Sequence, residues 1–204
     1  TNLLQIIALL EARIDALEAQ SPGPEAFTCG STVTFDGHDY ATVEIGTQCW
    51  FAENLRTTKY NDDAVIPSGL DNTAWSTTTD GAMTVSDEGG ANAATNLATY
   101  GRLYNWHAVN TGKLCPSGWH VPTQAEWDTL YDELGGFNSS GIAMKSSNSD
   151  TPSWNGTNSS GFSGLPGGSR NSVGYLNWVG DNGYWWSATP FGVNARYRQL
   201  SSNQ

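Results

Sequence analysis

The sequence predicts an α+β domain that follows a coiled-coil helix, and three features indicate this class. Short β-branched and aromatic segments follow residue 27, a helix with clear start and stop signals follows residue 122, and no βαβ rhythm typical of a parallel sheet is present. Nine tryptophans and a hydrophobic fraction of 38% suffice for a core in a chain of 204 residues. We therefore expect a coiled-coil stalk at residues 1–20, a linker at 21–26 and a globular domain at 27–204.

Residues 1–20 carry the spacing of a coiled-coil seam. Its apolar residues are four, three, four and three positions apart: Leu3, Ile7, Leu10, Ile14 and Leu17. Isoleucine at heptad position a and leucine at heptad position d favour a dimer, whereas Leu4 and Ile6 widen the seam and favour a three-helix coiled coil. A helix packed on its own domain is the alternative, but the breaker Ser21-Pro22-Gly23-Pro24 separates the helix from the domain. We expect a homo-oligomer through residues 1–20, a trimer rather than a dimer.

Residues 27–60 carry the signals of short strands. Segments 32–35 and 40–45 are rich in β-branched and aromatic residues, and Asp36-Gly37 between them is typical of a hairpin turn. Segment 48–51 begins a further strand. The domain is therefore expected to open with a β-hairpin.

Three cysteines are present, and their spacing does not match a zinc site. Cys29 and Cys49 lie at the base of the predicted hairpin, so we expect a disulfide between them, which is typical of an oxidising compartment. Cys115 would then be a buried free thiol or the partner of a cysteine beyond Gln204.

The clearest helix signal in the domain follows Pro122. Thr123 is a natural N-cap, Glu126 completes a capping box, and Gly135-Gly136 marks the end. The apolar face of this helix comprises Trp127, Leu130, Tyr131 and Leu134.

Elsewhere the pattern is weaker. Residues 61–98 are expected to be mostly loop, and residues from 137 onward to form short strands between long loops. A helix is expected within 99–111, with Tyr100, Leu103, Tyr104 and His107 on one face.

The net charge of −11 argues against two classes of partner. Nucleic acids and anionic membrane surfaces both require a cationic face, which this composition does not supply. No run of about 18 apolar residues occurs, so the sequence predicts no membrane span.

Acidic residues gather in the predicted loop at 61–98, which contains no Lys or Arg. A solvated acidic loop is the simpler interpretation, and a Ca²⁺ site is the alternative because this ion prefers carboxylate and carbonyl oxygens. The candidate ligands are Asp62, Asp63, Asp87 and Glu88.

Four motifs occur in a characteristic order along the domain. They are Ile45-Gly46-Thr47-Gln48-Cys49-Trp50-Phe51-Ala52-Glu53-Asn54-Leu55-Arg56, Gly112-Lys113-Leu114-Cys115-Pro116-Ser117-Gly118-Trp119-His120-Val121-Pro122-Thr123, Gly161-Phe162-Ser163-Gly164-Leu165-Pro166-Gly167-Gly168 and Gly183-Tyr184-Trp185-Trp186-Ser187-Ala188-Thr189. Together they closely resemble the Fibrobacter succinogenes major paralogous (FISUMP) domain family, from about Phe27 to the end of the chain.

The resemblance implies a C-type-lectin-like fold with a small antiparallel sheet, two helices and long loops. It also implies export from a bacterium and an adhesin-like role at the cell surface or outside the cell. Members of the family usually continue into a last strand that carries a cysteine. On this basis we expect Cys115 to pair with that cysteine, and the closing strand of domain 27–204 to be absent here or supplied otherwise.

An enzymatic function has little support in the sequence. Val121-Pro122-Thr123 with Glu126-Trp127 also resembles formylglycine-generating enzymes, which bind copper through a cysteine pair near the end of their domain. No cysteine follows Cys115. His38 and His107 are far apart in sequence, and His120 between Trp119 and Val121 is interpreted as a core histidine. We expect no catalytic activity.

A binding module is the favoured alternative. Aromatic side chains stack on sugar faces and amides bond to hydroxyls, and the C-terminal half is rich in both. The candidate ligand-binding residues are Asn177, Asp181, Asn182, Tyr184, Arg196, Tyr197 and Arg198, which we expect to be exposed. Adjacent Trp185 and Trp186 should face opposite sides of a strand, so at least one belongs to the core. A structural subunit that decorates an extracellular fibre is the other hypothesis.

Overall fold

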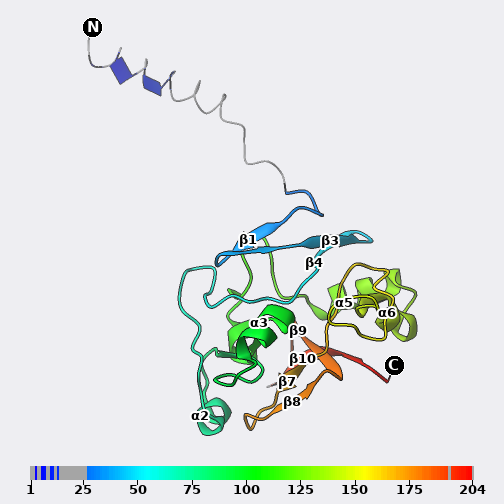
Figure 1. Cartoon of the computed structure of the whole chain (residues 1–204). Helices are drawn as coiled ribbons and strands as arrows, with labels where there is room; N and C mark the ends of the chain where they lie inside the picture. The colour runs from blue at the N-terminus through cyan, green and yellow to red at the C-terminus, as the bar shows by residue number, and fades with distance from the viewer. Residues whose placement is uncertain are drawn as a thin grey trace.

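The computed structural model describes residues 3, 6, 7, 10, 11, 13, 27–192 and 194–203. Its globular part mixes short helices with small sheets, which confirms the α+β class (Figure 1). In chain order the elements are β1 (Val33–Phe35), β2 (His38–Tyr40), β3 (Thr42–Ile45), β4 (Gln48–Phe51), α2 (Asn72–Thr77), β5 (Met83–Thr84), α3 (Ala93–Tyr100), β6 (Leu103–Tyr104), α4 (Trp106–Asn110), α5 (Gln124–Glu133), α6 (Phe137–Met144), β7 (Gly167–Arg170), β8 (Leu176–Val179), β9 (Asn182–Phe191) and β10 (Asn194–Ser201).

The predicted hairpin turn is confirmed, but the strand expected at 40–45 is divided. β1 pairs with β2 around Asp36 and Gly37, which both have positive φ (47° and 75°). β3 turns away and pairs with β4. The reason lies at Ala41, whose N–H donates to Glu53 Oε1 at 3.1 Å instead of to a neighbouring strand.

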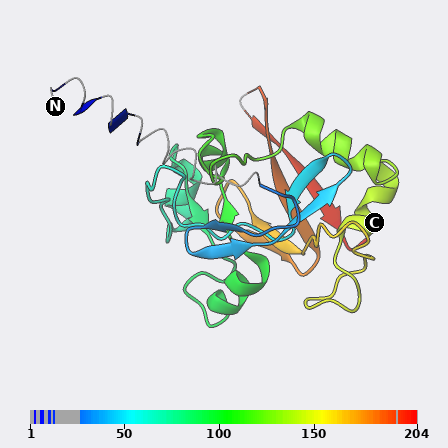
Figure 2. The ribbon, with the colours of Figure 1, turned by 90° about the horizontal axis from the view of Figure 1, so that it is seen from above.

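The C-terminal strands form a four-stranded sheet in the order β10-β9-β7-β8. β9 and β10 are antiparallel and cross behind the β3–β4 hairpin in the view from above (Figure 2). β7 joins β9 through one parallel pair, Gly168 with Gly183, and β8 forms the edge. These strands agree with the expectation of short strands after residue 137.

Helix α5 agrees closely with its sequence signals. Thr123 accepts from the Glu126 N–H, and the Glu126 carboxylate accepts from the Thr123 N–H at 2.7 Å, which completes the capping box. At the other end, Gly136 N donates to Tyr131 O and Gly135 N to Asp132 O, the two bonds of a Schellman ending.

The other helices differ from the prediction. The segment expected to be loop contains α2, β5 and most of α3, and the helix expected at 99–111 is split into the end of α3, β6 and α4. Gly101 has φ of 72°, which ends α3, and the Arg102 N–H then donates to Leu55 O at 2.9 Å. Helix α6 was not expected, because Phe137 and Ile142 are exposed while its buried residues include Ser140, so no apolar period marks it.

Two core clusters meet across β9. Trp185 packs against the first, around Trp127 and Leu130, and Trp186 packs against the second, around Ile66 and Met83. The opposite orientation of the adjacent tryptophans is therefore confirmed. Beside the first cluster, Lys145 is fully buried, donates through Nζ to Ser201 O at 3.0 Å and lies over the Trp154 ring.

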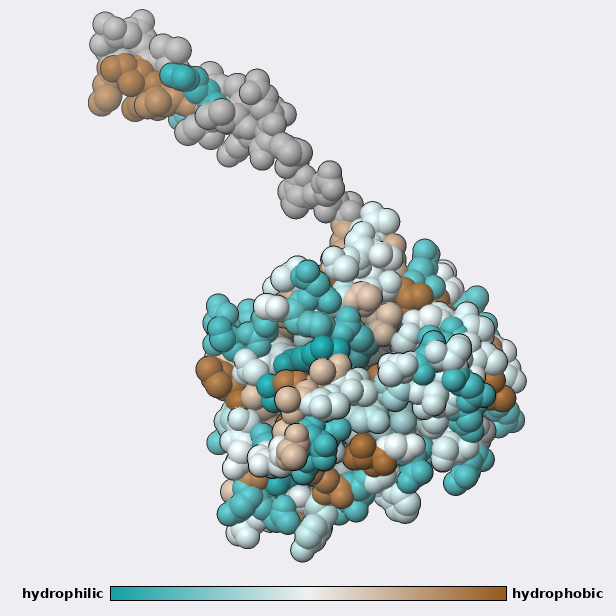
Figure 3. Space-filling model, viewed as in Figure 1, coloured by the Kyte–Doolittle hydropathy of each residue, from teal (hydrophilic) through white to brown (hydrophobic). Residues whose placement is uncertain are grey.

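The described residues of the predicted stalk are helical, and their apolar side chains are exposed. Leu3, Ile6, Ile7 and Leu10 are 73%, 45%, 42% and 54% exposed and appear as brown atoms near the N-terminus (Figure 3). Ile14, Leu17 and the linker 21–26 lie outside the described residues. In the described part of the chain, no helix has the length and apolarity needed to cross a membrane.

Candidate functional site

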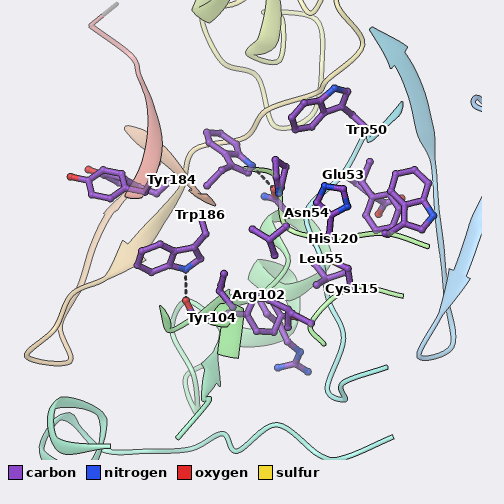
Figure 4. Close-up of a pocket in the computed structure, with 18 of the residues that line it drawn as sticks. Trp50, Glu53, Asn54, Leu55, Arg102, Tyr104, Cys115, His120, Tyr184 and Trp186 are labelled. Carbon is purple, nitrogen blue, oxygen red and sulfur yellow. Dashed lines mark hydrogen bonds between the residues drawn. The ribbon is translucent and has the colours of Figure 1, made fainter. Parts of the chain in front are cut away.

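The domain has a large pocket whose walls are mainly apolar and rich in aromatic side chains, which we call the aromatic pocket. Its volume is about 1170 Å³. Tyr184 and Trp186 of β9 line one side, and Trp50, Glu53 and His120 line the other (Figure 4). The Trp186 indole donates to Tyr104 O at 2.7 Å, so this wall is fixed by a hydrogen bond.

A second, smaller pocket lies beside the edge strand β8, and we call it the polar hollow. It has a volume of about 600 Å³. Its lining includes three carboxylates, one side-chain amide, one guanidinium and one tyrosine ring, from Asp71, Asp87, Glu88, Asn72, Arg170 and Tyr175. These residues come from the α2 region, the loop after β5, β7 and the β7–β8 turn.

Two exposed aromatic residues stand on and beside β8. Tyr175 is 60% exposed and Trp178 is 59% exposed. Asn171 fixes the turn before β8, because its side chain accepts from the N–H of Tyr175 at 2.9 Å and of Val173 at 3.1 Å. Tyr175 is therefore an aromatic surface held at the rim of the polar hollow.

Arg170 organises the floor of the polar hollow. Its Nη2 donates to Leu70 O at 2.8 Å, its Nε donates to Gly174 O at 2.9 Å, and its guanidinium stacks on Trp75 at 4.3 Å. Burial lowers the pKa of Arg170, while the charges of Glu88 and Asp71 oppose this change. The cation is thus engaged with the protein and serves to hold the walls together.

The carboxylates of the hollow retain acceptor capacity. One oxygen of Asp71 accepts from Ala74 N, one oxygen of Asp87 accepts from Asn92 N, and one oxygen of Glu88 accepts from the Thr84 hydroxyl. All three acidic residues are exposed. The other oxygen of each carboxylate can accept a hydrogen bond from a hydroxyl group of a ligand.

The predicted ligand-binding residues do not share one surface. Tyr184 and Tyr197 lie on the same face of β9 and β10, with ring centroids 5.7 Å apart. Asn177 lies on β8 and Asp181 in the turn after this strand. Hence only some of the set could contact one ligand.

Four of these expectations about exposure were wrong: Asn182 is buried, and Asn177, Tyr184 and Arg198 are partly buried. Asn182 is only 9% exposed, and its amide donates to the Tyr184 hydroxyl at 3.1 Å. Arg198 turns toward α5, where it bonds to Asp128 at 2.9 Å and stacks on Tyr131. Arg196 is exposed as expected but stacks on Phe191. Strand alternation places Arg196 and Arg198 on the face opposite Tyr197.

The calcium hypothesis gains no support. Among the described residues, no three His, Cys, Asp or Glu side chains gather into a metal site. Asp62 bonds to Lys113 Nζ at 2.7 Å, a cation from outside the acidic segment, whereas Asp87 and Glu88 line the polar hollow. Asp63 is exposed and has φ of 65°.

The cysteines agree with the pairing expected from the hairpin. Cys29 and Cys49 form a disulfide, with Cα atoms 5.7 Å apart. Cys115 carries a free thiol in the wall of the aromatic pocket, and burial raises its pKa to about 12. The thiol is therefore neutral and poorly nucleophilic at physiological pH.

One histidine expectation was wrong. The side chain of His120 is 61% exposed rather than part of the core, and it pairs with Glu126 at 2.8 Å. His38 pairs with Glu53 at the same distance. Both imidazoles thus face carboxylates and not a hydroxyl or thiol nucleophile.

The polar hollow could not be predicted from the sequence, although its parts carry signals. Asp87 and Glu88 belong to the acidic segment and Tyr175 to the aromatic C-terminal half, but they are distant in sequence. Arg170 joins these distant segments, because its guanidinium bonds to Leu70 O and Gly174 O and stacks on Trp75. A stacked guanidinium leaves no local pattern in a sequence.

Comparison with known proteins supports the resemblance drawn from the motifs. The family model described as the Fibrobacter succinogenes major domain matches residues 43–202. The curated proteins and the solved structures gave no match.

Proposed function

This chain belongs to the Fibrobacter succinogenes major domain family, and from that premise we propose that it is a non-catalytic, adhesin-like binding protein outside a bacterial cell. In this proposal a C-type-lectin-like head binds a glycan, and residues 1–20 join the heads into a homotrimer. The disulfide between Cys29 and Cys49 supports an oxidising location.

The observation that carries the proposal is Tyr175 at the rim of the polar hollow. A sugar presents an apolar face that a tyrosine ring can cover and hydroxyls that carboxylates and amides can bond. The ring is 60% exposed, and the hollow beside it supplies Asp71, Asn72, Asp87 and Glu88. This combination of one aromatic surface with several convergent polar groups is typical of a site for a small polar ligand.

The charges of the hollow specify the class of glycan. Three carboxylates line it, while the Arg170 guanidinium is already engaged by two carbonyls and by Trp75. An acidic sugar would meet uncompensated like charges, and the protein as a whole carries −11. The ligand is therefore a neutral or amino sugar and not a uronic or sialic acid.

A glycan array probed with the full chain tests this proposal. We expect signals on neutral or amino glycans, and the Tyr175→Ala variant should bind about tenfold more weakly, equivalent to roughly 1.4 kcal/mol. Phe191→Ala is the matched control, since Phe191 is 59% exposed at the far end of β9. Equal losses in both variants, or signals confined to acidic glycans, would contradict the proposed site.

The exposed apolar residues Leu3, Ile7 and Leu10 favour a second function, in which an oligomer decorates an extracellular fibre without binding glycan. An oligomer that gives no signal on any glycan would favour this alternative.

A further inference from the structure

The edge strand β8 continues from the rim of the polar hollow to a second exposed aromatic residue, Trp178. Tyr175 and Leu176 line the hollow at the start of this strand, and Trp178 lies two residues beyond Leu176. Trp178 is 59% exposed, and within the described chain its ring stacks on no other ring or cation. β8 lies on the side of the domain opposite β1 (Figure 1). A large aromatic surface is therefore open to solvent next to the proposed glycan site.

The backbone of Trp178 has a left-handed conformation, with φ of 65°. Gly168 lies opposite it on β7, and the two strands approach so closely there that a Cβ on Gly168 would lie 2.9 Å from Val179 N. This conformation suits glycine or asparagine and is unfavourable for a bulky side chain. The close approach thus explains the conformation but not the tryptophan, because glycine would adopt the same φ with less strain.

An exposed carboxylate lies close to Trp178. The Asp181 N–H donates to Trp178 O at 3.1 Å, which closes a turn over residues 178–181. The first and last Cα atoms of such a turn are less than about 7 Å apart. Asp181 is exposed, and its carboxylate accepts no hydrogen bond from the described residues. Trp178 is thus accompanied by an acceptor for hydroxyl groups, as Tyr175 is by the polar hollow.

The spacing of the two aromatic residues fits neighbouring units of one sugar chain. Tyr175 and Trp178 are three residues apart, which corresponds to at most about 10 Å along a strand. Two linked sugar rings have about this length. A sugar chain that begins in the hollow can therefore reach Trp178.

Charge and hydrogen-bonding capacity argue against other occupants of this surface. Residues 171–183 contain no Lys or Arg to attract an anionic lipid surface. An apolar protein surface placed over Trp178 would bury the Asp181 carboxylate without a partner. A sugar covers an aromatic ring with its C–H face and donates to a carboxylate through its hydroxyls.

We propose that Trp178 and Asp181 form a second sugar subsite, so that the domain binds an oligosaccharide that extends from the polar hollow along β8. This inference rests on the proposed glycan binding at Tyr175 and specifies its ligand as a chain of neutral or amino sugars. The strained tryptophan is kept for contact with the ligand and not for stability, as strained residues at binding sites are.

The test compares soluble β-1,4-linked oligomers of glucose, mannose, N-acetylglucosamine and glucosamine with one, two and four units, titrated into the full chain and followed by NMR. For the sugar that binds best, affinity should rise at least about tenfold from one unit to four, equivalent to roughly 1.4 kcal/mol. Trp178→Gly should remove this gain and leave the affinity for the single unit unchanged. Trp178→Tyr retains an aromatic ring and should keep most of the gain.

The glycine variant also separates a binding role from a structural one. Because glycine relieves the left-handed strain, Trp178→Gly should raise the melting temperature by about 2–4 °C. A lower melting temperature would assign the tryptophan to the fold and overturn the proposal. So would equal affinity for one and four units, or a gain that Trp178→Gly leaves intact, and in these cases the site at Tyr175 stands. Failure of every oligomer, together with a glycan array without signal, would overturn the proposed function as well.

Discussion

At the scale of single residues, the burial of Cys115 makes the stability of the protein depend on pH. Its thiol has a folded-state pKa of about 12, raised by burial from an ordinary value near 9. The folded protein therefore keeps a proton that the unfolded chain loses above pH 9. Stability from this group is complete below pH 9 and is lost as pH rises toward 12.

We expect the free energy of unfolding of the wild-type protein to fall by roughly 1 kcal/mol between pH 9 and 10 because of this proton. Cys115→Ala should lack this decrease, and urea unfolding at both pH values measures it. Tyr131, whose pKa is also raised to about 12 by burial from an ordinary value of 10, contributes less in this interval and is common to both proteins. Parallel curves for the two proteins would show that the thiol is not buried in the folded state.

At the scale of elements, helix α5 joins the sheet to the N-terminal hairpins. Gln124 N donates to Thr189 Oγ1 of β9 at 2.9 Å, and the Gln48 amide donates to Glu126 O at 3.2 Å. The N-terminus of α5 thus carries the helix cap and also bonds the helix to β9 and β4.

Loss of the N-cap should therefore be measurable. Thr123→Ala removes the hydroxyl that accepts from the Glu126 N–H and should lower stability by about 1 kcal/mol, or more because α5 connects several elements. Thr129→Ala is the matched control: this exposed residue lies within the same helix, and its hydroxyl donates only to Ala125 O. Thermal unfolding of both variants gives the comparison, and equal melting temperatures would contradict a role for the cap.

Elements with local signals could be predicted from sequence, and elements defined by distant contacts could not. The α5 cap, the Asp36-Gly37 turn and the disulfide all depend on residues close in sequence or on one hairpin. Helix α6 shows no apolar period because it buries Ser140 and exposes Phe137. The polar hollow depends on Arg170 reaching Leu70, a contact between residues 100 positions apart.

At the scale of the whole molecule, the exposed apolar residues of the stalk predict assembly. Ile7→Asp combined with Leu10→Asp places charges on the seam, where they cannot be buried without partners, and should convert the oligomer to monomers. Glu11→Gln combined with Arg13→Gln is the control on polar positions of the same helix. Sedimentation measures the oligomeric state of both double variants. If the first double variant keeps the oligomeric state of the wild type, the domain and not the stalk drives assembly.

The same double variant separates affinity from avidity. In the trimer that we propose, three linked heads would bind a glycan surface far more tightly than one head, although each site is unchanged. The monomeric form should therefore lose signal on a dense array yet keep the same affinity for a soluble glycan, as measured by calorimetry.

The burial of Lys145 has a practical consequence for chemical labelling. The chain contains only three lysines, and neither Lys59 nor Lys113 lines the aromatic pocket or the polar hollow. Lys113 O accepts from Asn61 N, so these two amines belong to one region of the surface. Amine-reactive dyes or sensor chips that attach to these two lysines would leave both pockets unmodified. Acylation of Lys145, which is 0% exposed, would report that the domain has opened.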